Sequence, residues 1–105
     1  MIEIEDFRKI EMKIVKIKKV ERVECSQKLL KLEVDVGKPL TIVAGLAETH
    51  KPGELVDKSV VLLTNLKPRM IFGIESQGML VNALYKGKPI LLIPDEEVPP
   101  GTMIT

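Results

Sequence analysis

The sequence predicts an all-β protein, built as a small five-stranded barrel with Greek-key connections, short helices and an extension at each end. Residues 30–36 alternate strictly between apolar and charged side chains, which is typical of a strand with one buried and one wet face. Residues 11–23 also alternate, but with a one-residue slip between Ile14 and Val15 that indicates a β-bulge and a strongly bent strand. Residues 60–63 are all apolar, as in a strand buried on both faces.

Length and composition limit the protein to one domain, residues 1–105, with a single core. Aromatic residues make up only 3% of the chain, so Val, Ile and Leu must fill that core. The single cysteine, Cys25, excludes an intramolecular disulfide and a multi-thiolate metal site, and we expect neither a metal nor a cofactor. The sequence contains no long apolar run and no export leader, so a cytoplasmic protein without a membrane partner is expected.

The N-terminal residues 4–10 predict a short amphipathic turn or helix. Asp6 is a candidate cap, and Ile4, Phe7 and Ile10 share one face at helical spacing. A long bent strand follows this segment, and a bent first strand allows one strand to pair on both sides of a barrel.

The middle of the chain predicts a hairpin and a helix. Residues 37–39 contain Gly and Pro and predict the turn between strands 30–36 and 40–43. A short helix is expected over residues 44–51, ended by the Pro-Gly pair at 52–53.

The C-terminal part predicts two further strands, residues 79–84 and 89–93, joined by a turn at 87–88. A short apolar end follows at residues 103–104. With five strands, a bent first strand and a helix between the third and fourth, the pattern favours the oligonucleotide/oligosaccharide-binding (OB) fold.

The central stretch, residues 65–80, reads NLKPRMIFGIESQGML and separates two predicted strands. It is longer and chemically more varied than an ordinary hairpin turn. Such a segment between buried strands is often a binding surface, and the alternative is an ordinary long loop.

The net charge of +1 gives little support for nucleic-acid binding, but the charges are unevenly distributed. Residues 8–31 hold nine cations against Glu11, Glu21 and Glu24: Arg8, Lys9, Lys13, Lys16, Lys18, Lys19, Arg22, Lys28 and Lys31. Residues 95–97 are all acidic. The sequence therefore allows a local basic patch, and a solvated, ion-paired surface is the alternative.

Catalytic chemistry has little support in the sequence. The only imidazole is His50 and the only thiol is Cys25, so a Cys-His nucleophile would require these two residues to meet. There is no Gly-rich phosphate loop and no zinc-ligand spacing. We therefore expect a binding module and not an enzyme.

Several blocks of the sequence resemble the tRNA-binding domain appended to methionyl-tRNA synthetases. That domain also occurs in free-standing structure-specific tRNA-binding proteins and in the cytokine-precursor component of animal synthetase complexes. The blocks that carry the resemblance are DFRKIEMKIVKI, KLLKLEVDVG, IVAGL, NLKPRMIFGIESQGML and PGT. The resemblance implies an OB-fold barrel that binds the outer corner of tRNA by shape and commonly dimerises through elements outside the barrel.

The resemblance also implies a set of RNA-binding residues. They are Lys28, Asn65, Lys67, Pro68, Arg69, Ser76, Gln77, Gly78 and Met79. Many members of the family follow the Arg with Lys, an apolar residue and Arg, where this chain has Met70, Ile71 and Phe72. Phe72 could stack on a base in place of the missing phosphate contacts.

These residue types suit contacts with a folded RNA. The cations would bind phosphates, and the amide and hydroxyl side chains would reach sugars and base edges. Structural alternatives exist for three of them, since Asn65 could cap a turn, Gly78 could serve a bulge and Met79 could lie in the core. Few aromatic residues are available for stacking, so shape recognition of tRNA is favoured over tracking of a single strand.

The expected partners are tRNA and the catalytic part of a methionyl-tRNA synthetase, in the same chain or as a separate subunit. A protein-interaction module that tethers a synthetase without touching RNA is the alternative, which the near-zero net charge favours. A homodimer is also expected, because the chain ends carry apolar residues that would be exposed on a monomer: Ile2, Ile4, Phe7, Ile10, Met103 and Ile104. The alternative is that these ends close the open bottom of the barrel.

Overall fold

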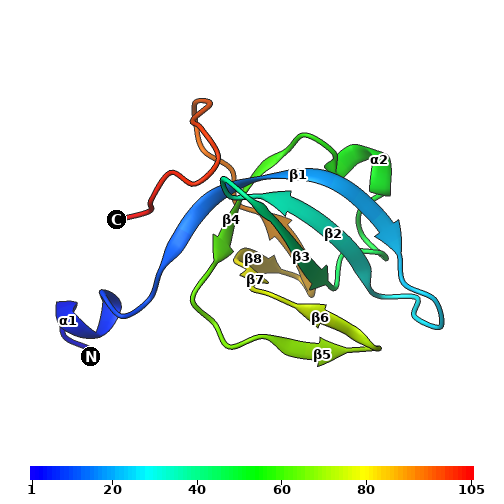
Figure 1. Cartoon of the computed structure of the whole chain (residues 1–105), viewed down its shortest axis with the longest axis horizontal. Helices are drawn as coiled ribbons and strands as arrows, with labels where there is room; N and C mark the ends of the chain where they lie inside the picture. Colours follow the sequence, from blue (N-terminus) through cyan, green and yellow to red (C-terminus); the bar gives the residue numbers. More distant parts are fainter.

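The computed structural model describes residues 1–105 and confirms the all-β fold (Figure 1). A curled five-stranded sheet has the strand order β3-β2-β1-β4-β7, and two further hairpins, β5-β6 and β8-β9, complete the structure. The elements are α1 (Ile4–Phe7), β1 (Met12–Arg22), β2 (Leu30–Asp35), β3 (Pro39–Ala44), α2 (Pro52–Leu55), β4 (Ser59–Leu63), β5 (Arg69–Ile71), β6 (Ile74–Ser76), β7 (Met79–Leu80), β8 (Asn82–Tyr85) and β9 (Lys88–Leu91).

Strand β1 is long and bent, as predicted, and it pairs antiparallel with both β2 and β4. The register shifts between Ile17 and Lys19. The slip in the sequence pattern placed the bulge earlier in the strand, at Ile14 and Val15. Both Ile14 and Val15 are buried. The C-terminal segment covers the strand at this point, because the Ile14 amide donates to the Thr102 carbonyl at 2.8 Å. The apparent slip in the sequence therefore reflects burial of both faces and not a bulge.

The core is aliphatic, as the composition predicted. Its cluster of 11 buried residues comes mainly from the inner faces of the strands: Val15, Ile17, Leu30, Leu32, Val34, Ile42, Leu46, Leu55, Val60, Leu62 and Leu80. Strand β4 is buried on both faces, since Val61 on its other face is only 8% exposed.

The predicted short N-terminal helix is confirmed, whereas the second helix lies elsewhere than predicted. Helix α1 is a single turn, and Asp6 lies inside it, where its carboxylate accepts a hydrogen bond from the Glu3 amide at 3.2 Å. Residues 44–51 do not form the expected helix. Their backbone is tied into turns, and the Ala47 amide donates to the carbonyl of Lys28 in the β1–β2 loop. The helix α2 instead begins at Pro52, which suits a first-turn position because proline has no amide proton to donate.

The central stretch contains a hairpin that the sequence patterns did not predict. Strands β5 and β6 are joined by Phe72 and Gly73, whose φ angles are 49° and 79°. Two consecutive positive φ values are typical of a tight hairpin turn. The expected strand over residues 79–84 is divided at Val81 into β7, which pairs with β4, and β8, which pairs with β9.

The two chain ends lie outside the barrel. Helix α1 projects away from it at the left of Figure 1, and the C-terminus lies on the same side of that view. The end of the chain pairs back on β1 through a bridge between Lys13 and Met103. None of the helices has both the length and the apolar character that a membrane crossing requires.

Candidate nucleic-acid interface

The central stretch borders a small hollow of about 160 Å³, which we call the Arg69 hollow. Lys67 and Arg69 line it beside the apolar side chains of Leu66 and Met79. Its lining also includes Ser76, which is buried. The hollow therefore combines two cations with an apolar wall, a combination that suits a phosphate and its attached sugar.

Ser76 forms part of the closure of the barrel. Its hydroxyl oxygen accepts a hydrogen bond from the Val43 amide at 3.0 Å and donates to the Gly78 carbonyl at 3.2 Å. The side chain joins β3 to the end of β6 and is only 5% exposed. Both hydrogen bonds of the hydroxyl are made to the protein, which gives Ser76 a structural role.

Gln77 and Gly78 continue this closure. The Gln77 side-chain oxygen accepts from the Thr41 amide, and the Gln77 amide donates to the Thr41 carbonyl, both at 2.8 Å. A Cβ atom on Gly78 would lie 2.8 Å from the carbonyl oxygen of Leu63, so only glycine fits there without a backbone shift. We call residues 76–78 the barrel latch.

Asn65 holds the N-terminal arm against the end of β4. Its side-chain oxygen accepts from the Glu11 amide at 2.9 Å, and its side-chain nitrogen donates to the Lys9 carbonyl at 2.7 Å. Thr64 adds two hydrogen bonds to the Glu11 carbonyl, from its amide and its hydroxyl. Asn65 is thus a clamp between segments that are 54 to 56 positions apart in the chain.

The remaining predicted site residues are exposed. Lys28 lies in the loop between β1 and β2, and Lys67, Pro68 and Arg69 lie before and at the start of β5. Phe72, at the tip of the β5–β6 hairpin, is 62% exposed and has a positive φ, which is uncommon for a bulky residue.

Met79 is 48% exposed, so it lies at the surface and not in the core. The structure therefore divides the predicted set into an exposed group and a hydrogen-bonded structural group. Lys28 does not line the Arg69 hollow, whereas Lys67, Arg69 and Met79 do.

The basic region of the chain is partly neutralised. Four of its cations form ion pairs, which are Lys9 with Asp6, Lys13 with Glu11, Lys16 with Glu97 and Lys19 with Glu33. The acidic tail is therefore not separate from the basic region, because Glu97 lies 3.2 Å from the Lys16 ammonium group. The Lys13 hydrogen bond, with smaller contributions from Thr64 and the Lys13 charge, lowers the pKa of Glu11 below its ordinary value.

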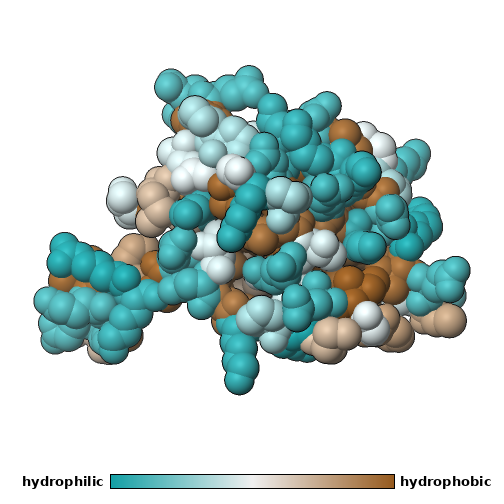
Figure 2. All heavy atoms as spheres, viewed as in Figure 1, coloured by the Kyte–Doolittle hydropathy of each residue, from teal (hydrophilic) through white to brown (hydrophobic).

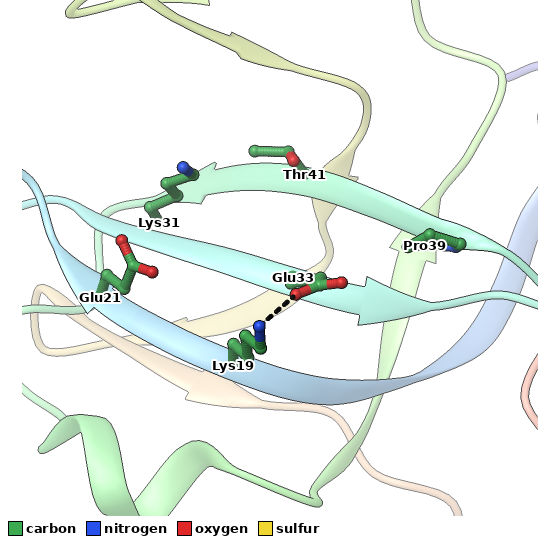
Figure 3. A pocket seen from close by; sticks show the side chains of 6 residues that line it. All are labelled: Lys19, Glu21, Lys31, Glu33, Pro39 and Thr41. Atoms are coloured by element: carbon green, nitrogen blue, oxygen red, sulfur yellow. Dashed lines mark ion pairs between the residues drawn. The ribbon is translucent and has the colours of Figure 1, made fainter.

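The outer face of β1–β3 also has a hollow, but its charges alternate (Figure 3). Lys19 pairs with Glu33 across the strands at 3.8 Å, and Glu21 and Lys31 lie nearby. This mixed pattern offers no net attraction for a phosphate backbone. Hydrophilic side chains cover much of the visible face, with hydrophobic atoms exposed between them (Figure 2).

Comparison with known families places this chain among RNA-associated domains. Residues 12–103 match the family described as "Putative tRNA binding domain". The methionine–tRNA ligase of Archaeoglobus fulgidus is 47% identical over 104 residues, covering 98% of this chain and 16% of the ligase. That of Methanospirillum hungatei is 52% identical, covering 98% of this chain and 15% of the ligase. The chain thus spans about a sixth of the length of these relatives.

Solved structures agree with the fold. A MetRS related protein from Pyrococcus horikoshii is 40% identical and superposes with a TM-score of 0.94, covering 100% of this chain and 98% of that one. The CsaA chaperone of Bacillus anthracis is 25% identical, with a TM-score of 0.91, and covers 100% of this chain and 99% of that one. The second match shows that this barrel also occurs in a protein described as a chaperone.

Proposed function

The chain belongs to the tRNA-binding domain family, and from this membership we propose that it captures tRNA as a non-catalytic module that serves a methionyl-tRNA synthetase. The observation that carries the proposal is the placement of Lys67 and Arg69 beside the Arg69 hollow, on a segment fixed at both ends. The Asn65 clamp holds one end and the barrel latch holds the other. A segment held in this way loses little conformational entropy when RNA binds.

The proposed contacts use the exposed residues of the predicted set. Arg69 would form a forked pair with a phosphate, and Lys67 would add a second positive charge. Phe72 would stack on an unpaired base or a sugar at the corner of the tRNA. Lys28 would contact the backbone from the β1–β2 loop, and Met79 would supply apolar surface beneath the ribose.

The synthetase relationship is proposed at the level of an accessory region. The catalytic part would lie in the same chain or in a separate subunit. A protein-interaction module that tethers a synthetase without touching RNA is the competing function, and its supporting feature is the apolar surface of the β8–β9 hairpin, where Leu84 is 79% exposed. Binding of tRNA by the isolated chain distinguishes the two functions.

We expect Arg69→Ala to weaken tRNA binding by about 1–3 kcal/mol, because a charge-assisted contact is lost. The slope of log affinity against log salt should also fall by about one unit. A mobility-shift titration over several salt concentrations measures both quantities. Lys51→Ala is the matched control, since Lys51 is exposed ahead of α2 and lines none of the hollows.

Unchanged affinity in Arg69→Ala would contradict the assignment of the Arg69 hollow. Absence of tRNA binding by the unmodified chain at low salt would contradict the proposed function itself. In that case the interaction module becomes the better description.

The proposed active form is a homodimer. The side chains of Ile4, Phe7 and Ile10 line a groove of about 400 Å³ together with Met103 and Ile104 from the other end of the chain. Ile2 beside it is 72% exposed. None of these side chains belongs to the buried core cluster, and α1 projects away from the barrel (Figure 1). A second copy of the chain is the partner that would cover them.

Sedimentation at micromolar concentration tests this dimer, with a monomer mass of 11.7 kDa as the reference. We expect Phe7→Lys to convert the dimer to a monomer without lowering the melting temperature, because a buried cation opposes association while α1 contributes no core residue. Leu84→Lys on the exposed β8–β9 hairpin is the comparison. If Leu84→Lys separates the copies and Phe7→Lys does not, the hairpin and not the terminal groove forms the interface.

A further inference from the structure

A second hollow lies beside the Arg69 hollow, and only two of its lining residues, Pro68 and Gln77, belong to the predicted RNA-binding set. It measures about 380 Å³ and is lined by Lys13, Lys38 and Gln77, among others, with Glu11 as its only carboxylate. We call it the Lys38 hollow. Leu66 lines both hollows, so the two adjoin at this side chain.

The β2–β3 turn presents Lys38 at this hollow. The Gly37 amide donates to the Asp35 carboxylate at 2.8 Å, and the Val36 amide donates to the Lys38 carbonyl at 3.0 Å. Gly37 has a φ of 101°, a conformation that side-chain-bearing residues rarely adopt. Lys38 itself is exposed and forms no ion pair, so its charge is available to a ligand.

Lys13, the other cation of the Lys38 hollow, is already engaged in an ion pair. The Lys13 ammonium group lies 3.1 Å from the Glu11 carboxylate, and its side chain is only 28% exposed. Glu11 is ionised at neutral pH, as glutamate ordinarily is, and Lys13 and Thr64 lower its pKa further. Asp35 is not part of the lining, and one of its carboxylate oxygens accepts the Gly37 amide.

Gln77 supplies a neutral donor to the same hollow. Its side-chain oxygen is bonded to the Thr41 amide, which fixes the orientation of the side chain and leaves the NH₂ group free to donate. The barrel latch therefore has a residue facing each hollow, because Ser76 lines the Arg69 hollow and Gln77 lines the Lys38 hollow.

We propose that the Lys38 hollow is a second phosphate-binding subsite, and that the RNA backbone crosses Leu66 with one phosphate at Arg69 and another at Lys38. The inference rests on the proposed tRNA-binding function and adds Lys38 and the Gln77 side-chain NH₂ group to its contacts. Glu11 limits the affinity, because its carboxylate repels phosphate and keeps Lys13 from contacting it.

The test compares Lys38→Ala, Glu11→Gln and Arg69→Ala in tRNA mobility-shift titrations against salt. We expect Lys38→Ala to weaken binding about three- to tenfold at low salt and to reduce the salt slope by about one unit. Glu11→Gln should strengthen binding by a similar factor, since it releases Lys13 and removes the repulsion. The backbone bonds of Glu11 to Asn65 and Thr64 do not involve its side chain and should persist.

Two further variants serve as controls for the loss of charge at Lys38. Lys38→Arg retains the charge and should keep the slope of the unmodified chain, and Lys51→Ala should leave both affinity and slope unchanged. If Lys38→Ala and Glu11→Gln bind like the unmodified chain while Arg69→Ala binds weakly, the second subsite is overturned and the proposed function stands. If the unmodified chain does not bind, the proposed function fails, and the subsite fails with it.

Discussion

Replacing Gly78 by alanine is expected to destabilise the domain by about 2–3 kcal/mol, because the new methyl group has no space. Its Cβ atom would lie 2.8 Å from the Leu63 carbonyl oxygen and 3.3 Å from side-chain carbons of Ile42 and Leu62. To accommodate the methyl group, the backbone must shift in β4 or in the barrel latch. For a domain of this size, the melting temperature should fall by about 10 °C or more.

Gly45→Ala is the control for this substitution. No atom lies within 4 Å of the place that a methyl group on Gly45 would take, and its φ is not positive, so alanine there should be nearly neutral. Thermal unfolding by circular dichroism without RNA measures both variants. Equal melting temperatures would mean that the latch does not need glycine, and Gly78 would then return to the RNA-contacting set.

Ser76→Ala is expected to cost about 1–3 kcal/mol of unfolding free energy, because it leaves a buried donor without its acceptor. The donor is the Val43 amide, which bonds the Ser76 hydroxyl at 3.0 Å, and the Gly78 carbonyl loses a donor at the same time. Urea unfolding measures the change, and hydrogen exchange at the Val43 amide should accelerate. The edge of β3 would then open before the rest of the sheet.

Ser59→Ala provides the comparison, since the Ser59 hydroxyl makes no hydrogen bond within the protein. It should change stability by less than about 0.5 kcal/mol. A Ser76→Ala protein with normal stability and lost tRNA binding would contradict the structural assignment. The hydroxyl would then have to reach the RNA in the bound state.

Together, the contacts divide the central stretch into two kinds of residue. Asn65, Ser76, Gln77 and Gly78 hold the segment to the N-terminal arm, to β3 and to β4. The exposed cations Lys67 and Arg69, together with Phe72, lie on the segment between these anchored residues. A binding surface on a small barrel needs such support, because a free loop of this length would lose entropy on every encounter with RNA.

Local patterns in the sequence were sufficient to predict the barrel and most of its strands. Alternation in β2 and the all-apolar β4 are local features, and each reports burial of one or both faces directly. The bend in β1 was predicted as well, although its register shift lies later in the strand than the slip in the pattern. The turn at Gly37 was also predictable, because a positive φ strongly favours glycine. The identity of the core followed from composition, since few aromatic residues were available.

Which polar residues of the central stretch hydrogen-bond to the protein depends instead on contacts made in three dimensions. Asn65 bonds a segment 54 positions earlier, and Ser76 bonds a strand 33 positions earlier, and no local pattern records such partners. The β5–β6 hairpin was missed for the same kind of reason, because three-residue strands are too short to show a period. The meeting of Lys13, Lys38 and Gln77 in one hollow likewise depends on barrel closure, which brings together side chains that lie far apart along the chain.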